Sequence, residues 1–522
     1  MKKSIITSIK CIAISFATVG ITSCSNTRFL KEGETLYTGS KLTIKGDSLS
    51  KSDRVALKDN LEENIIPKPN SSFFGLRPRL YIYNITSEPK KQKGLKYWLK
   101  YKVGQKPILL SDVDIDFNKK ILVNYAENKG YFNAKAQGDT ISKDKKAVVN
   151  YVLQPHKRYY INQVNFPKDT TLVVNKEINK TEAKTLLKEK QPFDLDVIKA
   201  ERERIDSRLK ENGFYYFHPD NIIVQADSTV TNKQDVELFV KLKDQTPEQA
   251  KKQFTIDKVI VFPDYNIRQA RKGLYQMPMP TDSLGKYEQN GFYMVDSKKN
   301  FKPKVFDRAL YFKTGDIYNR ADHNLTLNRL INLGVFKFVK NDFVISDSIN
   351  NKFDVYYTLT PREFQSLRLE VLGRTNSANY GGGELNLNWT HRNILKGAEQ
   401  LKMALYGAFD MQLGGQKDAN NIFRAGFNTQ LSIPRIVAPF KFNSSSAFVP
   451  RTNIEMGYEY QNRSKLYTLH NFNTSFGYVW KENAQKEHNL KVFSATLLFP
   501  EKVTDEYNSK MYDSRGNIIT PS

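Results

Sequence analysis

Residues 383–390 have the sequence Gly-Glu-Leu-Asn-Leu-Asn-Trp-Thr, in which large apolar residues alternate with polar ones. Alternation with a period of two places the apolar side chains on one face of a β-strand and the polar side chains on the other. Residues 401–411 and 425–433 continue this alternation. Each run is about ten residues long, the length that a tilted strand needs to cross the hydrocarbon of a bilayer. The pattern therefore predicts the wall of a membrane β-barrel, because the strands of a soluble sandwich are usually about five or six residues long.

About seven candidate strands lie between residues 364 and 500, and the later ones cover residues 453–461, 471–480 and 489–499. A single-chain bacterial barrel has an even number of strands, at least about eight. Seven strands would leave two unpaired edges, which are unfavourable in lipid. We therefore expect residues 364–522 to form only the N-terminal part of an antiparallel transmembrane β-barrel. The chain would then be truncated, a fragment, or dependent on a second chain to close the barrel.

The N-terminus has the features of a secretory signal. Lys2 and Lys3 precede an apolar segment at residues 11–21, which is too short to span a membrane as a helix. We assign residues 1–23 to a signal peptide. The segment ends in Ile-Thr-Ser-Cys, which resembles a bacterial lipobox, so Cys24 is predicted to be lipidated and to begin the mature chain. The alternative is an ordinary signal peptide followed by an incidental cysteine.

The positive charge of the chain is unevenly distributed. The 522 residues contain 80 Lys and Arg against 55 Asp and Glu, but residues 364–522 hold only 18 and 13 of these. The basic excess therefore precedes the predicted barrel. Behind a signal peptide, a Lys-rich surface beside an anionic membrane is expected and nucleic acid is not. A chain of this length is expected to contain several domains.

Three segments between the signal peptide and the predicted barrel repeat one pattern. Each has an amphipathic helix, then a glycine (Gly130, Gly213 or Gly334), then aromatic residues and a strand. Apolar residues three, four and seven positions apart give each helix a buried stripe. A glycine just past the helix suits the left-handed position that ends it.

The strands around these helices complete three small α+β modules of strand, helix, helix, strand and strand. The closing strands are predicted at residues 148–153, 236–242 and 353–359, and opening strands at 161–164 and 256–259. The third module carries an insertion at residues 263–308. The predicted boundaries are 24–155 for the lipid anchor and first module, 156–248 for the second, 249–363 for the third, and 364–522 for the barrel part.

Tandem modules in front of a β-barrel resemble the POTRA domains of the superfamily that includes BamA and TamA. The resemblance rests on Phe-Lys-Thr-Gly-Asp-Ile-Tyr-Asn at residues 312–319, on residues 328–336 at the end of the third helix, and on the predicted turn at residues 391–401. It covers residues 24 to about 500. With the lipobox, the chain is similar to the lipidated TamA-like (TamL-type) subgroup of the Bacteroides-type lineage. The Arg-Gly-Phe loop motif that the family places late in the barrel is absent from the sequence.

The resemblance implies an outer-membrane lipoprotein with its modules in the periplasm. Its implied role is to assist insertion, assembly or translocation of proteins, through strand addition on open sheet edges. The first barrel strand, near residues 365–374, would be the seam where a client strand enters. The implied partners are nascent outer-membrane proteins, a TamB-like periplasm-spanning protein and the lipid bilayer. The alternatives are a pore or scaffold like those of two-partner secretion, and a soluble periplasmic binding lipoprotein.

The sequence offers little catalytic chemistry. The six histidines are isolated and form no HExxH or paired-ligand spacing. Asp112, Asp114 and Asp116 mimic the start of a calcium loop, but no glycine or distal glutamate follows at the required spacing, so acidic residues at a helix N-terminus are the better interpretation. We predict a protein that is not an enzyme, with no catalytic residues, no cofactor and no metal site.

Overall fold

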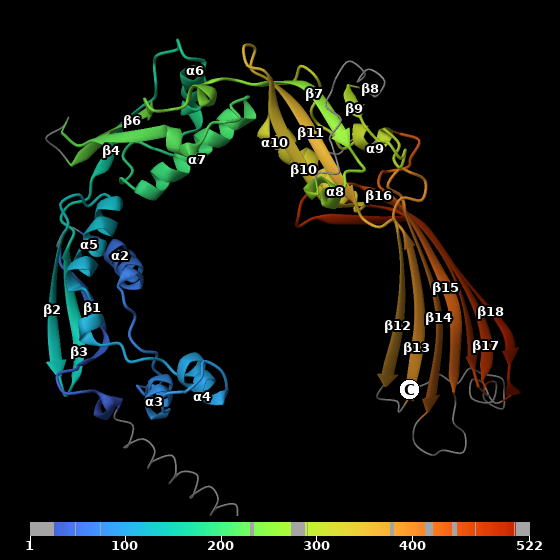
Figure 1. Cartoon of the computed structure of the whole chain (residues 1–522), viewed down its shortest axis with the longest axis horizontal. Coiled ribbons are helices and arrows are strands. Elements are labelled where there is room, and N and C mark those ends of the chain that lie inside the picture. The colour runs from blue at the N-terminus through green and yellow to red at the C-terminus, as the bar shows by residue number, and fades with distance from the viewer. Residues whose placement is uncertain are drawn as a thin grey trace, which may run out of the picture. The chain divides into compact units, whose positions relative to one another are not determined.

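The structure is a computed structural model of the chain. It describes residues 26–46, 49–73, 75–229, 234–272, 288–289, 291–375, 380–412, 421–440, 446–464, 466–505 and 507. The predicted signal peptide and Cys24 lie outside this set. The chain divides into two compact units, Met1–Asp206 with His218–Thr246, and Ser207–Phe217 with Pro247–Ser522 (Figure 1). No helix among the described residues is both long enough and apolar enough to cross a membrane.

The first module is a three-stranded sheet covered by two helices. Its elements are β1 (Leu36–Ile44), α2 (Lys51–Asn64), α5 (Ile115–Asn128), β2 (Lys135–Lys143) and β3 (Lys146–Gln154). The strand order is β1-β3-β2, with β1 parallel and β2 antiparallel to β3. The module follows the predicted order of strand, helix, helix, strand and strand.

The acidic run at the start of α5 caps helices, as the sequence predicted. The Asp114 carboxylate accepts a hydrogen bond from the backbone N–H of Phe117 at 2.8 Å, which satisfies a donor that the first turn would otherwise leave unpaired. The Asp112 carboxylate accepts from the N–H of Leu109 at 2.9 Å. This interpretation of the acidic run is therefore confirmed.

A helical insertion between α2 and α5 was not predicted. It comprises α3 (Pro78–Ile85), α4 (Leu95–Trp98) and a π-helical turn (Leu99–Val103). The ammonium of Lys100 links parts of this insertion to one another. It lies 3.0 Å from the Glu88 carboxylate and donates a hydrogen bond to the carbonyl of Thr86. Leu95 and Trp98 remain exposed. These helices are too short to show the apolar stripe that identifies the other helices in the sequence.

The second module repeats the plan of the first. It contains β4 (Tyr160–Asn165), α6 (Val173–Asn179), α7 (Leu195–Glu211), β5 (Ile222–Asp227) and β6 (Asp235–Leu242), with strand order β4-β6-β5. The buried carboxylate of Glu201 on α7 accepts hydrogen bonds from the Thr185 hydroxyl, the backbone N–H of Leu186 and the Arg204 guanidinium. A buried charge is tolerated because it is paired and fully hydrogen-bonded.

The third module has a larger sheet because its insertion adds strands. It contains β7 (Thr255–Phe262), α8 (Ile267–Arg271), β8 (Glu288–Gln289), β9 (Phe292–Met294), α9 (Lys304–Asp307), α10 (Arg320–Asn332), β10 (Phe336–Asp347) and β11 (Lys352–Pro361). The strand order is β10-β11-β7-β9-β8. Phe254 and Phe353 stack in its core with ring centroids 4.3 Å apart. Two short strands of the predicted insertion, β8 and β9, thus extend the sheet.

The C-terminal region forms a single antiparallel sheet of seven strands in chain order (Figure 1). The strands are β12 (Gln365–Thr375), β13 (Tyr380–His391), β14 (Gln400–Gln412), β15 (Ile422–Ile433), β16 (Arg451–Arg463), β17 (Tyr467–Lys481) and β18 (Glu487–Val503). All seven predicted strands are present, and each is at least as long as predicted. The predicted fold class, α+β modules followed by part of an antiparallel barrel-like sheet, is confirmed.

Candidate functional site

One face of the seven-stranded sheet is apolar and exposed. A single register row crosses all seven strands with an apolar or aromatic side chain in each, namely Leu369, Leu387, Leu405, Phe427, Tyr458, Phe472 and Leu497. The exposed fractions are 62% for Leu369, 55% for Leu405 and 55% for Leu497. A continuous apolar surface of this extent marks contact with a membrane or with another protein.

The opposite face of the same sheet is polar and internally hydrogen-bonded. The Asp410 carboxylate on β14 lies 3.1 Å from Arg374 on β12 and 3.2 Å from Arg424 on β15. Arg374 also pairs with Glu384 on β13 at 2.6 Å, so one ionic cluster spans four adjacent strands. The Tyr406 hydroxyl donates to Glu459 at 2.5 Å. A membrane barrel wall likewise has one apolar face and one polar face.

Both edges of this sheet are open in the part of the chain that the structure describes. β12 pairs only with β13, and β18 pairs only with β17. β12 covers the predicted seam, and its side chains are almost all exposed, including Val371 at 77%. The outer backbone groups of such a strand need partners wherever water is absent. β12 is therefore a ready template for one further strand.

The modules present open edges as well. Within the described residues, β2 lies at one edge of the first sheet and β5 at one edge of the second. The side chains of β2 are largely exposed along its length. An extended peptide can add to such an edge through main-chain hydrogen bonds, which require little particular client sequence.

The three repeat glycines lie where a module meets the following segment. Their φ angles are +89° for Gly130, +97° for Gly213 and +79° for Gly334. The Gly130 carbonyl accepts from the N–H of Tyr159 at 2.9 Å, and the Gly213 carbonyl accepts from the N–H of Phe254 at 3.0 Å. The same contact thus recurs after α5 and after α7. A left-handed backbone is costly for residues with a side chain, which explains glycine at these positions.

The third module is fixed to the seven-stranded sheet by hydrogen bonds at two places. The predicted turn at residues 391–401 lies between β13 and β14, where the Asn393 amide donates to the carbonyl of Asn300 at 2.8 Å. On the other side, Arg329 donates to the carbonyl of Ser446 at 3.0 Å, and Arg451 donates to the carbonyl of Asn332 at 2.9 Å.

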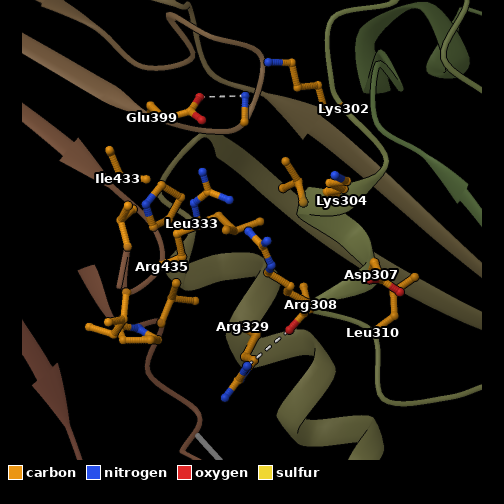
Figure 2. A pocket seen from close by; sticks show the side chains of 18 of the residues that line it. Lys302, Lys304, Asp307, Arg308, Leu310, Arg329, Leu333, Glu399, Ile433 and Arg435 are labelled. Carbon is orange, nitrogen blue, oxygen red and sulfur yellow. Dashed lines mark hydrogen bonds between the residues drawn. The ribbon is translucent and has the colours of Figure 1, made fainter. Parts of the chain in front are cut away.

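A cavity of about 1420 Å³ lies between these two attachment points (Figure 2). Six cationic side chains line it, and only two acidic ones do. The cations are Lys302, Lys304, Arg308, Lys313, Arg329 and Arg435, and the acids are Asp307 and Glu399. Glu399 already accepts a hydrogen bond from the backbone N–H of Gly397 at 2.7 Å. The cavity therefore carries an excess of positive charge.

The arginines of the cavity are held close to one another. Arg329 donates to the carbonyl of Arg308 at 3.1 Å, and Arg308 and Arg435 line the same cavity (Figure 2). Burial and then repulsion by Arg435 lower the pKa of the Arg308 guanidinium, while Asp307 opposes the shift. Burial also lowers the pKa of Arg329, and Tyr311 opposes this shift. Both groups stay protonated at neutral pH, because the ordinary pKa of arginine lies far above neutral. The cavity thus brings several like charges together.

Only some of the site residues predicted from the sequence lie in the described part of the chain. The glycines and the seam strand are in described parts of the chain, whereas the predicted lipidation site, Cys24, is not. Sequence reasoning missed the cationic cavity, because Arg308 and Arg435 are far apart in the chain and neither belongs to a recognisable motif. Across the described ranges, no group of three or more His, Cys, Asp or Glu side chains could hold a metal ion.

Comparisons with known proteins found similarity to solved structures only. No family model and no curated protein matches it. One similar solved structure is POTRA domains 3–5 of BamA from Haemophilus influenzae, with 15% identity and a TM-score of 0.29, covering 63% of this chain and 99% of that one. Another is BamA from Haemophilus ducreyi lacking POTRA domains 1–3, with 12% identity and a TM-score of 0.34, covering 65% of this chain and 63% of that one.

CdiB from Acinetobacter baumannii is also similar, with 11% identity and a TM-score of 0.25, covering 66% of this chain and 55% of that one. This chain thus spans just over half of CdiB and less than two thirds of the H. ducreyi structure. With identities and TM-scores this low, the similarities by themselves establish neither the function nor the partners of the chain.

Proposed function

We propose that the chain is an outer-membrane lipoprotein of the TamL type that assists the assembly or translocation of other proteins without catalysing a reaction. The observation that carries the proposal is the apolar row that crosses all seven strands and ends at the open edge of β12. A sheet with one lipid-facing side and one unpaired edge can bind a client strand and shield its backbone from lipid.

In this mechanism a client strand binds first to an open edge of a module and then to the open edge of the seven-stranded sheet. An extended client first adds to an exposed module edge such as β2 or β5. It then pairs with β12 (Gln365–Thr375), whose backbone groups gain partners as the client strand enters the bilayer. A TamB-like periplasm-spanning protein would deliver clients to the modules. Lipidation of Cys24 would hold the N-terminus at a membrane, and loss of radioactive palmitate from the Cys24→Ala variant tests that part.

The alternative of a soluble periplasmic binding lipoprotein fits the structure less well. Such a protein would need the C-terminal strands to form a sandwich with a shared core. In the described residues these strands form a single sheet, and no second sheet covers the exposed apolar row of Leu369, Leu405 and Leu497.

Site-specific photocrosslinking tests the proposal. A photoreactive residue at Leu367 or Leu369 in β12 is expected to capture nascent barrel proteins, because these positions border the open edge. The matched control is the same residue at Phe427 in β15, which is flanked by strands on both sides and should capture none. A membrane-embedded protein that never captures a client from β12, or captures equally from β15, would contradict the seam role. Capture of a single secreted partner would instead favour a pore like those of two-partner secretion.

A further inference from the structure

The cationic cavity between the third module and the sheet contains charge that the protein does not neutralise. Among the described residues, no carboxylate forms an ion pair with Arg308, Arg435, Lys302, Lys304 or Lys313. The two arginines repel each other, and an oxyanion bound between them would remove this repulsion. Guanidinium groups bind phosphate oxygens with paired hydrogen bonds, which makes phosphate a fitting anion.

Apolar side chains line the cavity as well. They include Ile433, Val437 and Phe440, which come from the same segment as Arg435, and Phe440 is 64% exposed. A ligand that fills the cavity must therefore present both negative charge and hydrocarbon. A free inorganic anion presents only the negative charge.

One apolar lining residue, Ile433, also belongs to the exposed apolar face of the sheet. Ile433 is the last residue of β15 and lies an even number of positions from Phe427, with no break in the strand register. Side chains at alternate positions share one face of a strand. The acyl chain of a ligand that extends from the cavity past Ile433 would therefore lie on the surface that we assign to lipid.

We propose that this cavity binds the headgroup of an anionic phospholipid, with its phosphate between Arg308 and Arg435 and its acyl chains along Ile433, Val437 and Phe440. Lys302 and Lys304 add positive charge at the rim. The bound lipid fills the space between the third module and the sheet at the membrane surface. This inference rests on the proposed membrane location of the sheet. An extended client peptide is a separate hypothesis, which the continuity with the lipid-facing side disfavours.

The test uses the full chain in a neutral detergent and three soluble probes. These are dihexanoyl-phosphatidylglycerol below its micelle concentration, the phosphatidylcholine of the same chain length, and inorganic phosphate. The wild-type chain should bind the phosphatidylglycerol about tenfold or more tightly than the phosphatidylcholine, because each basic residue near an anionic lipid surface contributes to its binding. Displacement of the lipid by an equal concentration of inorganic phosphate would overturn the proposal in favour of a free-anion site.

Substitutions locate the site. The double variant Arg308→Gln with Arg435→Gln should lose the preference for phosphatidylglycerol, whereas Lys337→Gln with Lys340→Gln, two exposed positions on β10, should keep it. If the arginine variant does not fold, Lys302→Gln with Lys304→Gln at the exposed rim should still weaken binding about two- to fivefold. Unchanged affinity in a folded arginine or rim variant would overturn the proposal, as would tighter binding of an extended barrel-strand peptide at the same arginines.

Flotation with phosphatidylcholine vesicles separates this inference from the proposed function. Insertion of the sheet depends on its apolar face and not on the lipid headgroup, so wild type and arginine variant should both float. A wild-type chain that does not float would count against the proposed function. Chains that float equally but show no phosphatidylglycerol preference would overturn only the lipid site.

Discussion

Replacing Leu405 with lysine is expected to prevent stable membrane integration of the sheet. Leu405 lies near the middle of β14, between Leu387 and Phe427 in the apolar row. A lysine on the lipid face near the bilayer midplane costs about 2–4 kcal/mol. The measurement is the fraction of protein that resists alkaline carbonate extraction from membranes, and this fraction should fall sharply in Leu405→Lys.

The matched control places the same charge on the opposite face of the next strand. Gln430 in β15 donates to the Glu455 carboxylate at 2.9 Å, so a lysine in Gln430→Lys can pair with that carboxylate. This variant should integrate as the wild type does. Equal loss of integration in both variants would mean that the two faces do not differ in environment, which is incompatible with a barrel wall.

Replacing Gly130 with alanine is expected to destabilise the first unit by about 2–5 kcal/mol. The φ of +89° costs a residue with a side chain about 1–2 kcal/mol. A Cβ at this position would also lie 2.8 Å from the carbonyl oxygen of Phe193 and 3.2 Å from its Cβ, so backbone must shift. Overpacking of this kind typically costs a further 1–3 kcal/mol or so. Hydrogen exchange of the Tyr159 amide, which donates to the Gly130 carbonyl, measures the local effect.

Gly33 provides the control for the backbone contribution alone. Its φ is +84°, but no atom lies within 4 Å of an added Cβ. Gly33→Ala should therefore destabilise its own turn by only about 1–2 kcal/mol and leave the exchange of the Tyr159 amide unchanged. Similar exchange of that amide in Gly130→Ala and in wild type would show that the close contact with Phe193 is not needed to hold the junction.

The elements that the sequence predicts well are those whose periodicity is set by a single buried or lipid-facing side. The seven long strands follow this rule, because one face of each strand carries mostly apolar or aromatic side chains. The helices α5, α7 and α10 follow it too, since each buries one stripe against a sheet. The glycine after each helix adds a local signal with a stereochemical cause.

The features that the sequence does not predict depend on contacts between distant segments or on short elements. The insertion with α3 and α4 has helices of eight and four residues, which are too short to establish a period. The extension of the third sheet by β9 depends on pairing with β7, a contact that its three residues do not reveal. The cationic cavity brings together Arg308, which follows α9, and Arg435, which lies between β15 and β16. These two segments are far apart in the sequence.

The most direct measurement of the central claim is the solvent accessibility of successive side chains along β14 in lipid vesicles. Spin labels would replace single residues from Leu401 to Met411, and their collisions with oxygen and with a water-soluble nickel complex would be compared. A lipid-facing wall predicts alternation with a period of two, in which Met403, Leu405 and Phe409 favour oxygen and Lys402 and Tyr406 favour nickel. Uniform accessibility to nickel along the whole strand would contradict the claim that this sheet forms a membrane wall.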